Sequence, residues 1–488
     1  MEKAGITIFF TFLKYNLGGK EEMNKVIADI DWKQLYAFSS DQAILGLCFE
    51  GVERLGREYP DELKQNPIGR ELLMTWMAKA QQIRRQNKNV NGVAVKLYSK
   101  FREDGLRCCI LKGQGNALMY PNPYSRTPGD IDVWVNASRE DITEYAKRHF
   151  NLEDDIRFHH LETTMDGVPV ELHFFPCSMN NPFYHARLQK WFKRNVDLQC
   201  SHIVGLPDGA GEIAIPTTAF NVIYQLTHLY HHFFDEGIGM RQIIDYYYVV
   251  CDFYKVDQKS SNPSVSLSKG SSTFSPSPSQ WSLHPLRFPR FRGTETSGSG
   301  DVTAPSRCSE PLRSKDGGPS KVSPDCAEWD RWGMSGASKV SPDCAGWDRR
   351  DAIGDIASDA SVSSAFTTDS SASTALDVVQ RELKYLGLWK FAGAVMYVMK
   401  EVLGLSEDKM IVPMDENRGK LLLTEILNGG NFGKHFTKYG HFTQQGMAKK
   451  YFLKIWRNMH FVRYYPAEAL SEPIFRTWHF FWRVKNKK

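Results

Sequence analysis

Cysteine patterns and strong net charge are both missing from this sequence of 488 residues. The nine cysteines include neither a CxxC pair nor the Cys and His spacing of a zinc site. The vicinal Cys108 and Cys109 sit in an apolar run, so we expect buried thiols and a cytoplasmic, reducing location. The formal net charge of +5 is small for this length, so overall charge does not demand a nucleic acid partner.

Long hydrophobic runs are missing as well. The apolar stretch from Ile6 to Leu13 ends at Lys14, and it is far too short to cross a bilayer. It also lacks the basic start, longer apolar core and cleavage site of a secretory signal. We therefore expect no stable membrane insertion. The 42% hydrophobic and 12% aromatic content is nevertheless enough for a sizeable core and more than one domain.

The most informative stretch is LKGQGNALMYPNPYSRTPGDIDVWV, residues 111–135. Two apolar strands are expected here, joined through a glycine-containing turn, and the second carries Asp130 and Asp132. Residues i and i+2 of a strand point to one face, so both carboxylates should emerge side by side. Such a repulsive pair makes physical sense around a divalent cation, and Mg²⁺ is bound by carboxylates together with substrate phosphates. The pattern indicates phosphoryl chemistry.

A third carboxylate fits the same site. Asp166 and Gly167 predict a turn, and the β-rich run VPVELHFF that follows places Glu171 and His173 on one face. If this strand lies beside the one with Asp132, Glu171 completes a cluster able to hold two metal ions. His173 could orient a carboxylate, touch substrate or be a buried structural imidazole.

Together these motifs resemble a known family. The order LKG, Y, R, GDID and V, followed by VELHF, resembles polymerase-beta-type nucleotidyltransferases, and more closely a bacterial family of uncharacterised nucleotidyltransferases. The resemblance extends to DWKQLYAFSSDQAILGL, to HLYHHFFDEGIGMRQIIDYYYV and to the aromatic C-terminus. One departure is that the superfamily usually has Gly-Ser at the phosphate turn, where this chain has Lys112-Gly113-Gln114-Gly115.

The resemblance implies an α+β fold with a small mixed-sheet core wrapped by helical regions. It implies transfer of a nucleoside monophosphate from an NTP, with ATP expected, to a hydroxyl acceptor, with release of pyrophosphate. Mg²⁺ or Mn²⁺ would be the cofactor. The expected metal-binding and catalytic residues are Asp130, Asp132 and Glu171. The expected phosphate-binding residues are Lys112, Gly113, Gly115 and Arg126.

Two of the polar motifs allow more than one interpretation. Arg126 could contact phosphate or form a structural salt bridge. His228 and His232 have an i,i+4 helical spacing that can chelate a metal, but packing or hydrogen bonding is the stronger interpretation because no HExxH glutamate lies between them.

Composition divides the chain into five regions. We expect an N-terminal helical region (1–105), the α/β core (106–205), a helical region (206–258), a disordered insert (259–375) and a C-terminal helical region (376–488). The insert is rich in Ser, Pro, Gly and Asp, and SKVSPDCAEWDR returns in it as SKVSPDCAGWDR. Two copies are too few for a folded solenoid, so this is a repeat-expanded linker.

The C-terminus leaves the acceptor open. Residues 449–488 interleave basic and aromatic side chains, which could stack and neutralise RNA or could be a buried aromatic face. We expect core packing, with Trp478 and Trp482 buried, and hence a small-molecule acceptor. The alternatives are an enzyme that acts on tRNA or protein, and a catalytically inactive binding or scaffold protein with the same fold.

Overall fold

The computed structural model describes residues 3–152, 157–261, 374–431, 453 and 455–486. The chain divides into two units, one formed by Met1–Asn262 with Ser361–Lys488 and the other by Pro263–Ala360. The second unit lies outside the described residues, and so does nearly all of the expected insert with its repeat. The described helices stop and resume close to the expected limits, at Ser261 and Ala375.

Helices dominate the first unit. The α-helices are α1 (Lys3–Asn16), α2 (Trp32–Asp41), α3 (Leu45–Glu58), α4 (Pro60–Gln65), α5 (Arg70–Glu103), α6 (Gly113–Ala117), α7 (Arg139–His149), α8 (Pro182–Ser201), α9 (Thr218–Asp235), α10 (Met240–Ser261), α11 (Ala375–Tyr385), α12 (Trp389–Leu403), α13 (Glu416–Gly429) and α15 (Pro466–Asn486). Short 3-10 helices are η1 (Met23–Lys25), η2 (Ile27–Asp29), η3 (Pro123–Ser125), η4 (Pro207–Gly209) and η8 (Glu407–Lys409).

Four strands form a mixed sheet in the order β1-β2-β4-β3. They are β1 (Cys108–Leu111), β2 (Ile131–Val135), β3 (His160–Met165) and β4 (Val168–His173). The central β2–β4 pair is parallel, and the two outer pairs are antiparallel. A separate hairpin is formed by β5 (Ile203–Leu206) and β6 (Gly211–Ala214). A small mixed sheet among helices confirms the predicted fold class, while the five region boundaries stay predictions.

The β3–β4 hairpin is set by its turn residues. Asp166 and Gly167 have φ angles of 50° and 78°, a left-handed pair of the kind that two-residue hairpin loops require. The predicted turn is therefore confirmed. The strands continue from it in strict register, which pairs Glu162 with Glu171 and His160 with His173.

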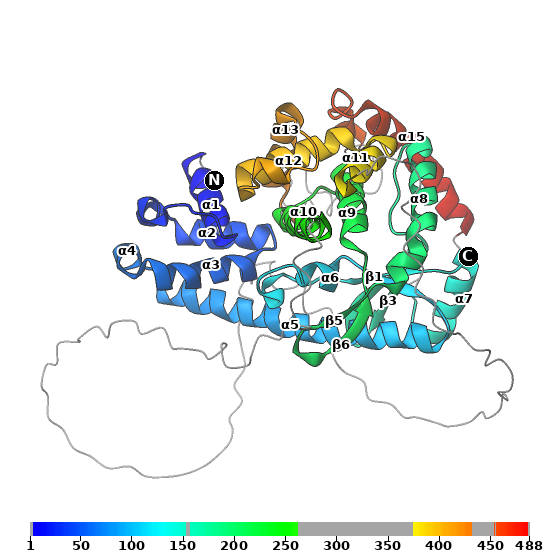
Figure 1. The fold of residues 1–488 in the computed structure, drawn as a ribbon, viewed down its shortest axis with the longest axis horizontal. Helices are drawn as coiled ribbons and strands as arrows, with labels where there is room; N and C mark the ends of the chain where they lie inside the picture. The colour runs from blue at the N-terminus through cyan, green and yellow to red at the C-terminus, as the bar shows by residue number, and fades with distance from the viewer. Residues whose placement is uncertain (1–2, 153–156, 262–373, 432–452, 454, 487–488) are drawn as a thin grey trace, which may run out of the picture. The chain divides into compact units, whose positions relative to one another are not determined.

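One face of the sheet is apolar. Val133 and Leu172 are fully buried there, in one cluster with Leu97 of α5 and Ile142 of α7. Figure 1 shows α5 running along one side of the strands. Burial of these side chains anchors the sheet, so its opposite face can carry polar groups.

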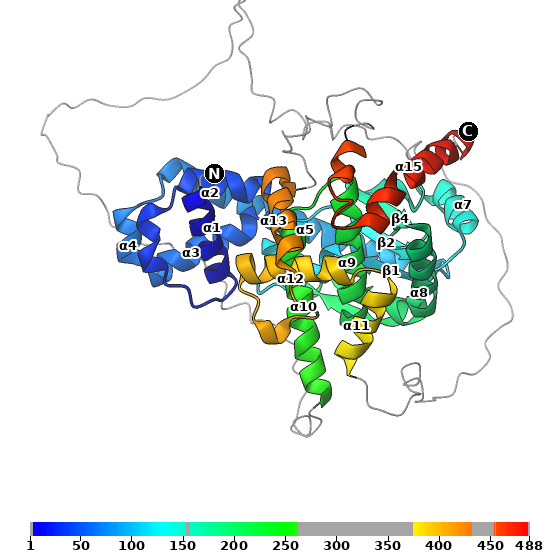
Figure 2. The same ribbon diagram turned by 90° about the horizontal axis from the view of Figure 1, so that it is seen from above.

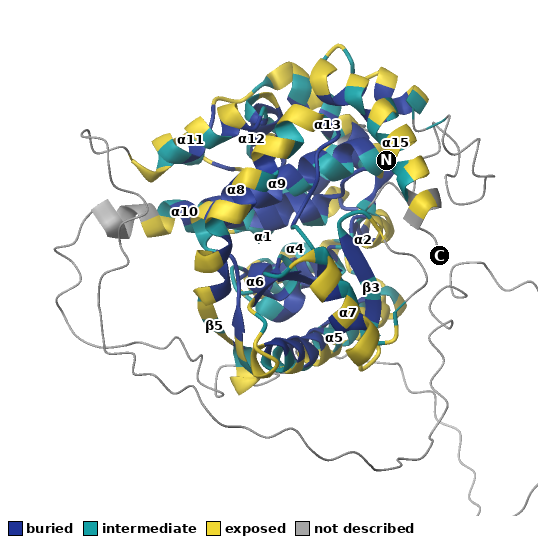
Figure 3. Ribbon diagram, turned by 90° about the vertical axis from the view of Figure 1, so that its right-hand side faces the viewer, coloured by how far each residue is buried: buried dark blue, intermediate teal, exposed yellow. Residues whose placement is uncertain are grey.

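The opposite face meets α9, which is largely buried (Figure 3). Trp134 of β2 stacks on Phe220 of α9, with ring centroids 5.9 Å apart and an interplanar angle of 20°. Seen from above, α1–α4 gather at one end and the sheet lies toward the other, with α12 and α13 between them (Figure 2). The helix α9 therefore connects the helical core with the polar face of the sheet.

The helix α15 corrects one expectation. Trp478 is 46% exposed and Trp482 is half-buried, so the prediction that both are core residues is wrong. The physical reason is that this C-terminal helix packs through one side only, where Phe475 and Trp478 contact the ring of Phe158. The dense aromatic sequence indicated burial, but burial depends on which faces of the helix have a neighbour.

Two other expectations agree with the described residues. Cys108 and Cys109 are buried thiols in β1, with 1% and 0% exposure. Across the described ranges, no helix combines the length and apolar content that a membrane span requires.

Candidate functional site

A row of carboxylates crosses the polar face of the sheet. Asp132 of β2 lies directly opposite Glu171 of β4, and Glu171 lies opposite Glu162 of β3. Paired residues on neighbouring strands point to the same face, so the three side chains project together. Asp130 lies one residue before β2 and lines the same cavity. The sequence thus placed Asp130, Asp132 and Glu171 together but missed Glu162.

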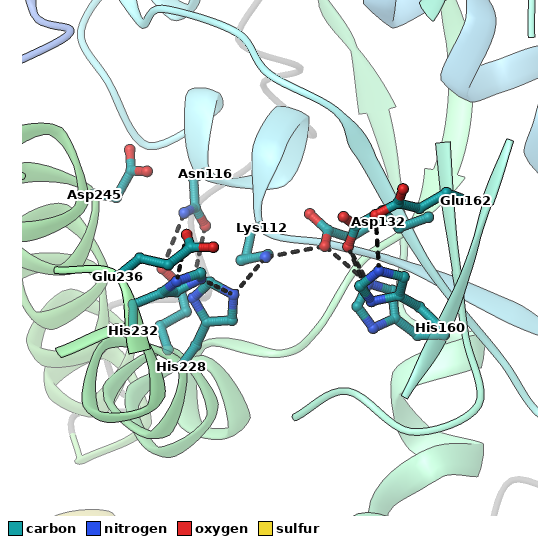
Figure 4. Close-up of polar contacts among 12 residues, drawn as sticks. Lys112, Asn116, Asp132, His160, Glu162, His228, His232, Glu236 and Asp245 are labelled. Carbon is teal, nitrogen blue, oxygen red and sulfur yellow. Dashed lines mark hydrogen bonds and ion pairs between the residues drawn. The ribbon is translucent and has the colours of Figure 1, made fainter. Parts of the chain in front are cut away.

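Asp132 is neutralised by two neighbouring cationic groups. Its Oδ1 lies 3.0 Å from Lys112 Nζ and 2.9 Å from His173 Nε2, and His173 Nε2 also lies 3.1 Å from Glu171 Oε2. Burial alone would raise the pKa of Asp132, but Lys112 and His173 hold it below its usual range. Burial would lower the pKa of His173, but its hydrogen bonds to Asp132 and Glu171 raise it to about 9. Figure 4 shows Lys112 reaching toward Asp132.

The other two predicted carboxylates have different environments. Burial would raise the pKa of Glu171, but the hydrogen bond from His173 lowers it below its usual value. Asp130 is an exposed residue at the rim of the cavity. Protein atoms that surround its carboxyl group reduce its hydration, and together with the charges of Asp132 and Glu171 they raise its pKa to about 6. The site therefore contains two carboxyls with lowered pKa values, Asp132 and Glu171, and one with a raised pKa, Asp130.

The turn after β1 is strained. Lys112 has φ 50° and ψ −130°, a backbone conformation that residues other than glycine rarely adopt, and Gly113 has φ 38°. This conformation turns Lys112 Nζ toward Asp132 and toward His228 Nε2, at 2.7 Å. Burial would lower the pKa of Lys112, but Asp132 and the other carboxylates raise it. Lys112 therefore stands as a fixed positive charge beside the carboxylate row.

The two glycines of the predicted phosphate turn have different surroundings. Gly113 lines the cavity, whereas Gly115 is buried within α6. A Cβ on Gly115 would lie 3.2 Å from Cγ2 of Ile215, so the absence of a side chain there allows close packing. The assignment of Gly115 to phosphate binding stays a prediction, and its position favours a packing role.

Arg126 forms a buried salt bridge, one of the two roles that the sequence allowed. Its Nε and Nη2 each lie 2.8 Å from a carboxylate oxygen of Asp245, and Tyr120 Oη donates to the same carboxylate at 2.8 Å. Arg126 and Asp245 are 5% and 7% exposed. The guanidinium lines the cavity, but two of its nitrogens are used by Asp245, and phosphate contact stays a prediction.

The α9 histidines extend the polar network. His232 Nε2 lies 3.1 Å from His228 Nε2, and its Nδ1 lies 3.7 Å from Glu236 Oε2 (Figure 4). Among the described residues, the groups that converge closely enough to hold a metal do not include this pair. Hydrogen bonding, with Lys112 as the link to the sheet, is the role that the contacts support.

All these groups meet in one cavity of about 360 Å³, a size typical of small-ligand sites. Every predicted site residue except Gly115 lines this cavity. Its polar and glycine lining residues are Lys112, Gly113, Asn116, Arg126, Gly129, Asp130, Asp132, Arg157, His159, His160, Glu162, Glu171, His173, Gln225, His228, His231, His232, Asp235, Glu236, Arg241, Gln242 and Asp245.

Comparisons with known proteins point to one family. Residues 28–260 match the profile of a family described as uncharacterised nucleotidyltransferases, a range that contains the sheet and α9. Among curated proteins there was no match. A solved structure of an antigenic nucleotidyltransferase-like protein from Paracoccidioides brasiliensis is 15% identical and covers 37% of this chain and 90% of its own. Its TM-score is 0.23.

The family match covers the carboxylate row, the strained turn and the cavity wall from α9. It supports nucleotidyl transfer as the general activity, and hence a transferase. Over residues 28–260, the chain is similar to the uncharacterised nucleotidyltransferase family.

Proposed function

We propose that this protein is a metal-dependent nucleotidyltransferase that moves a nucleoside monophosphate from an NTP, with ATP expected, to a small-molecule hydroxyl. One observation carries the proposal: Asp132 and Glu171 lie opposite each other on neighbouring parallel strands at the wall of a small-ligand cavity. The strained turn at Lys112 and Gly113 opens into the same cavity. The resemblance to polymerase-beta-type enzymes and to a bacterial family supports the same chemistry.

The donor atoms suit a hard cation. Mg²⁺ and Mn²⁺ prefer oxygen ligands, and Asp130, Asp132 and Glu171 offer carboxylate oxygens. Asp132 already accepts contacts from Lys112 and His173 through Oδ1, but a carboxylate has about four lone-pair sites in all. Oδ2 can therefore take a cation without loss of those contacts. When bound, the cation would neutralise triphosphate charge and polarise the reacting phosphate.

The residues of the chain have separate tasks in the transfer. Lys112 places its positive charge beside the triphosphate, and Gly113 lets the backbone approach a phosphate oxygen. The acceptor oxygen forms a bond to the α-phosphorus while the bond from that phosphorus to the bridging oxygen breaks and pyrophosphate leaves. Glu171, held ionised by His173, accepts the hydroxyl proton. Positioning and charge neutralisation supply most of the acceleration.

A second candidate is a catalytically inactive binding protein. The observation that favours it is the double contact of Asp132 with Lys112 and His173, because these internal cations stabilise the carboxylate in the absence of a metal ion. A binding protein would take up an NTP without cleaving it.

The two candidates differ in one assay. We would incubate the full chain with Mg²⁺ and each α-labelled NTP, together with cell metabolites, RNA or protein, and then locate the label. Label on a small molecule with release of pyrophosphate supports the transferase. Nucleotide-dependent thermal stabilisation with the label still in the NTP under all conditions would support the binding protein instead.

A further inference from the structure

Three imidazoles converge beside the carboxylate row. His159 lies just before β3, His160 begins that strand, and His173 ends β4 directly opposite His160. Their ring centroids are 4.2 Å apart for His159 and His160, 5.1 Å for His160 and His173, and 5.5 Å for His159 and His173. One ring nitrogen from each lies within 4.8 Å of the other two.

Two of these rings are buried with an unsatisfied nitrogen. His160 is 3% exposed and His173 is 2% exposed. Within the described part of the chain, Nδ1 of each has no hydrogen-bond partner. Buried polar atoms are nearly always satisfied, so two unpaired ring nitrogens in one cluster indicate a missing ligand.

Carboxylates hold the opposite nitrogens of the same rings. His173 Nε2 lies 2.9 Å from Asp132 Oδ1, and His160 Nε2 lies 3.4 Å from Glu162 Oε1. A carboxylate on one nitrogen, with the other nitrogen directed to a metal, is how proteins orient histidine ligands. Such an outer carboxylate would account for Glu162, which has no task in the proposed transfer.

Glu171 lies beside the cluster as an outer carboxylate. Its Oε2 lies 3.1 Å from His173 Nε2, the nitrogen that Asp132 also contacts, and 3.4 Å from His160 Nδ1 without a hydrogen bond. A metal bound at His173 Nδ1 would lie on the opposite edge of that ring, so Glu171 remains part of the carboxylate row.

We propose that His159, His160 and His173 form a site for a divalent transition metal of the zinc type, with a water molecule as the fourth ligand. Imidazole nitrogens suit zinc and its neighbours, whereas Mg²⁺ prefers oxygen alone. Binding displaces the proton from His173 Nδ1. This site lies beyond the proposed nucleotidyl transfer, which uses carboxylate oxygens, and it does not depend on that activity.

The test measures metal binding by the full-length, untagged protein after treatment with a chelator. Equilibrium dialysis against Zn²⁺, with metal content by atomic emission, should give one equivalent that excess Mg²⁺ does not displace. Co²⁺ in place of Zn²⁺ should give the visible absorption of a tetrahedral site. His160→Gln and His159→Gln should lose the tight equivalent, and Glu162→Gln should weaken it about 10–100-fold.

The controls separate this site from the rest of the molecule. His149→Gln changes an exposed histidine of α7 and should keep the zinc equivalent. Asp130→Asn should also keep it while losing nucleotidyl transfer, so failure of either proposal can be recognised. If circular dichroism shows that His160→Gln does not fold, the half-buried His159→Gln decides. Absence of a tight equivalent in the wild type, or its full retention in folded His159→Gln, would overturn the site.

Discussion

Arg126 and Asp245 form a buried bidentate ion pair that joins the loop before β2 to α10. Loss of one partner would leave a charge buried without compensation, so Arg126→Ala or Asp245→Ala should reduce the free energy of unfolding by about 3–5 kcal/mol. Urea denaturation measures this. Arg148→Ala is the matched control, because Arg148 pairs with Glu144 at 63% and 72% exposure and should change stability by less than about 1 kcal/mol. Equal, small effects of all three substitutions would contradict the buried pair.

A pH dependence should arise from Glu468 of α15. This carboxylate is 1% exposed and accepts a hydrogen bond from the backbone N–H of Asn181 at 3.2 Å. Burial raises its pKa to about 7 from the ordinary 4.5, so the folded protein holds the proton more tightly than the unfolded chain does. The stabilisation is complete below pH 4.5 and is lost as the pH rises through about 7.

The variant Glu468→Gln tests this dependence, because its side chain does not titrate. Between pH 5 and pH 8, the wild type should lose up to about 3 kcal/mol of stability relative to Glu468→Gln. Chemical denaturation of both proteins across that range measures the difference. Parallel stability curves would show that Glu468 keeps an ordinary pKa.

The two glycines of the turn after β1 should respond differently to substitution. Gly113 needs a left-handed backbone, so Gly113→Ala should distort the turn and weaken Mg²⁺–ATP binding. Gly115→Ala should instead reduce stability by about 1–3 kcal/mol through Ile215. The control Gly92→Ala adds a methyl group in open space on α5 and should not lower either property. Nucleotide-induced thermal shift and denaturation separate the two effects, and normal nucleotide binding by Gly113→Ala would remove Gly113 from the phosphate site.

Substitution of the aromatic residues of α15 distinguishes a small-molecule acceptor from RNA. Because Trp478 is 46% exposed, Trp478→Ala should reduce the free energy of unfolding by less than about 1.5 kcal/mol. Trp191 is buried, so Trp191→Ala should reduce it by about 3–5 kcal/mol. With a small-molecule acceptor, Trp478→Ala should leave RNA affinity unchanged. If RNA is the acceptor, the exposed Trp478, Phe480 and Phe481 should stack on bases, and binding should weaken as salt rises. Filter binding at several salt concentrations measures this.

Local patterns in the sequence were enough for much of the sheet. Alternation placed Asp130 with Asp132 on one face of the first expected strand and Glu171 with His173 on one face of the second, and the Asp166-Gly167 turn fixed the hairpin. Two strands that continue in register from this turn pair Glu171 with Glu162 and His173 with His160. The sequence therefore already implied both pairs.

Contacts between distant segments could not be inferred in the same way. The contact of Lys112 with His228 and the pairing of Arg126 with Asp245 both depend on how α9 and α10 pack against the sheet, more than 100 residues along the chain. The exposure of Trp478 depends on α15 having only one packed side. Side-chain chemistry and periodicity do not contain that information.

The most direct test compares transfer and binding in Glu171→Gln. We expect this variant to bind Mg²⁺–ATP, because Asp130, Asp132 and Lys112 are unchanged, but to transfer labelled AMP at least about 100-fold more slowly. Asp132→Asn should lose both binding and transfer, and Glu212→Gln, an exposed carboxylate on β6, should lose neither. Metal-dependent transfer at the wild-type rate by folded Glu171→Gln and Asp132→Asn would show that the Asp132–Glu171 pair is not the catalytic centre.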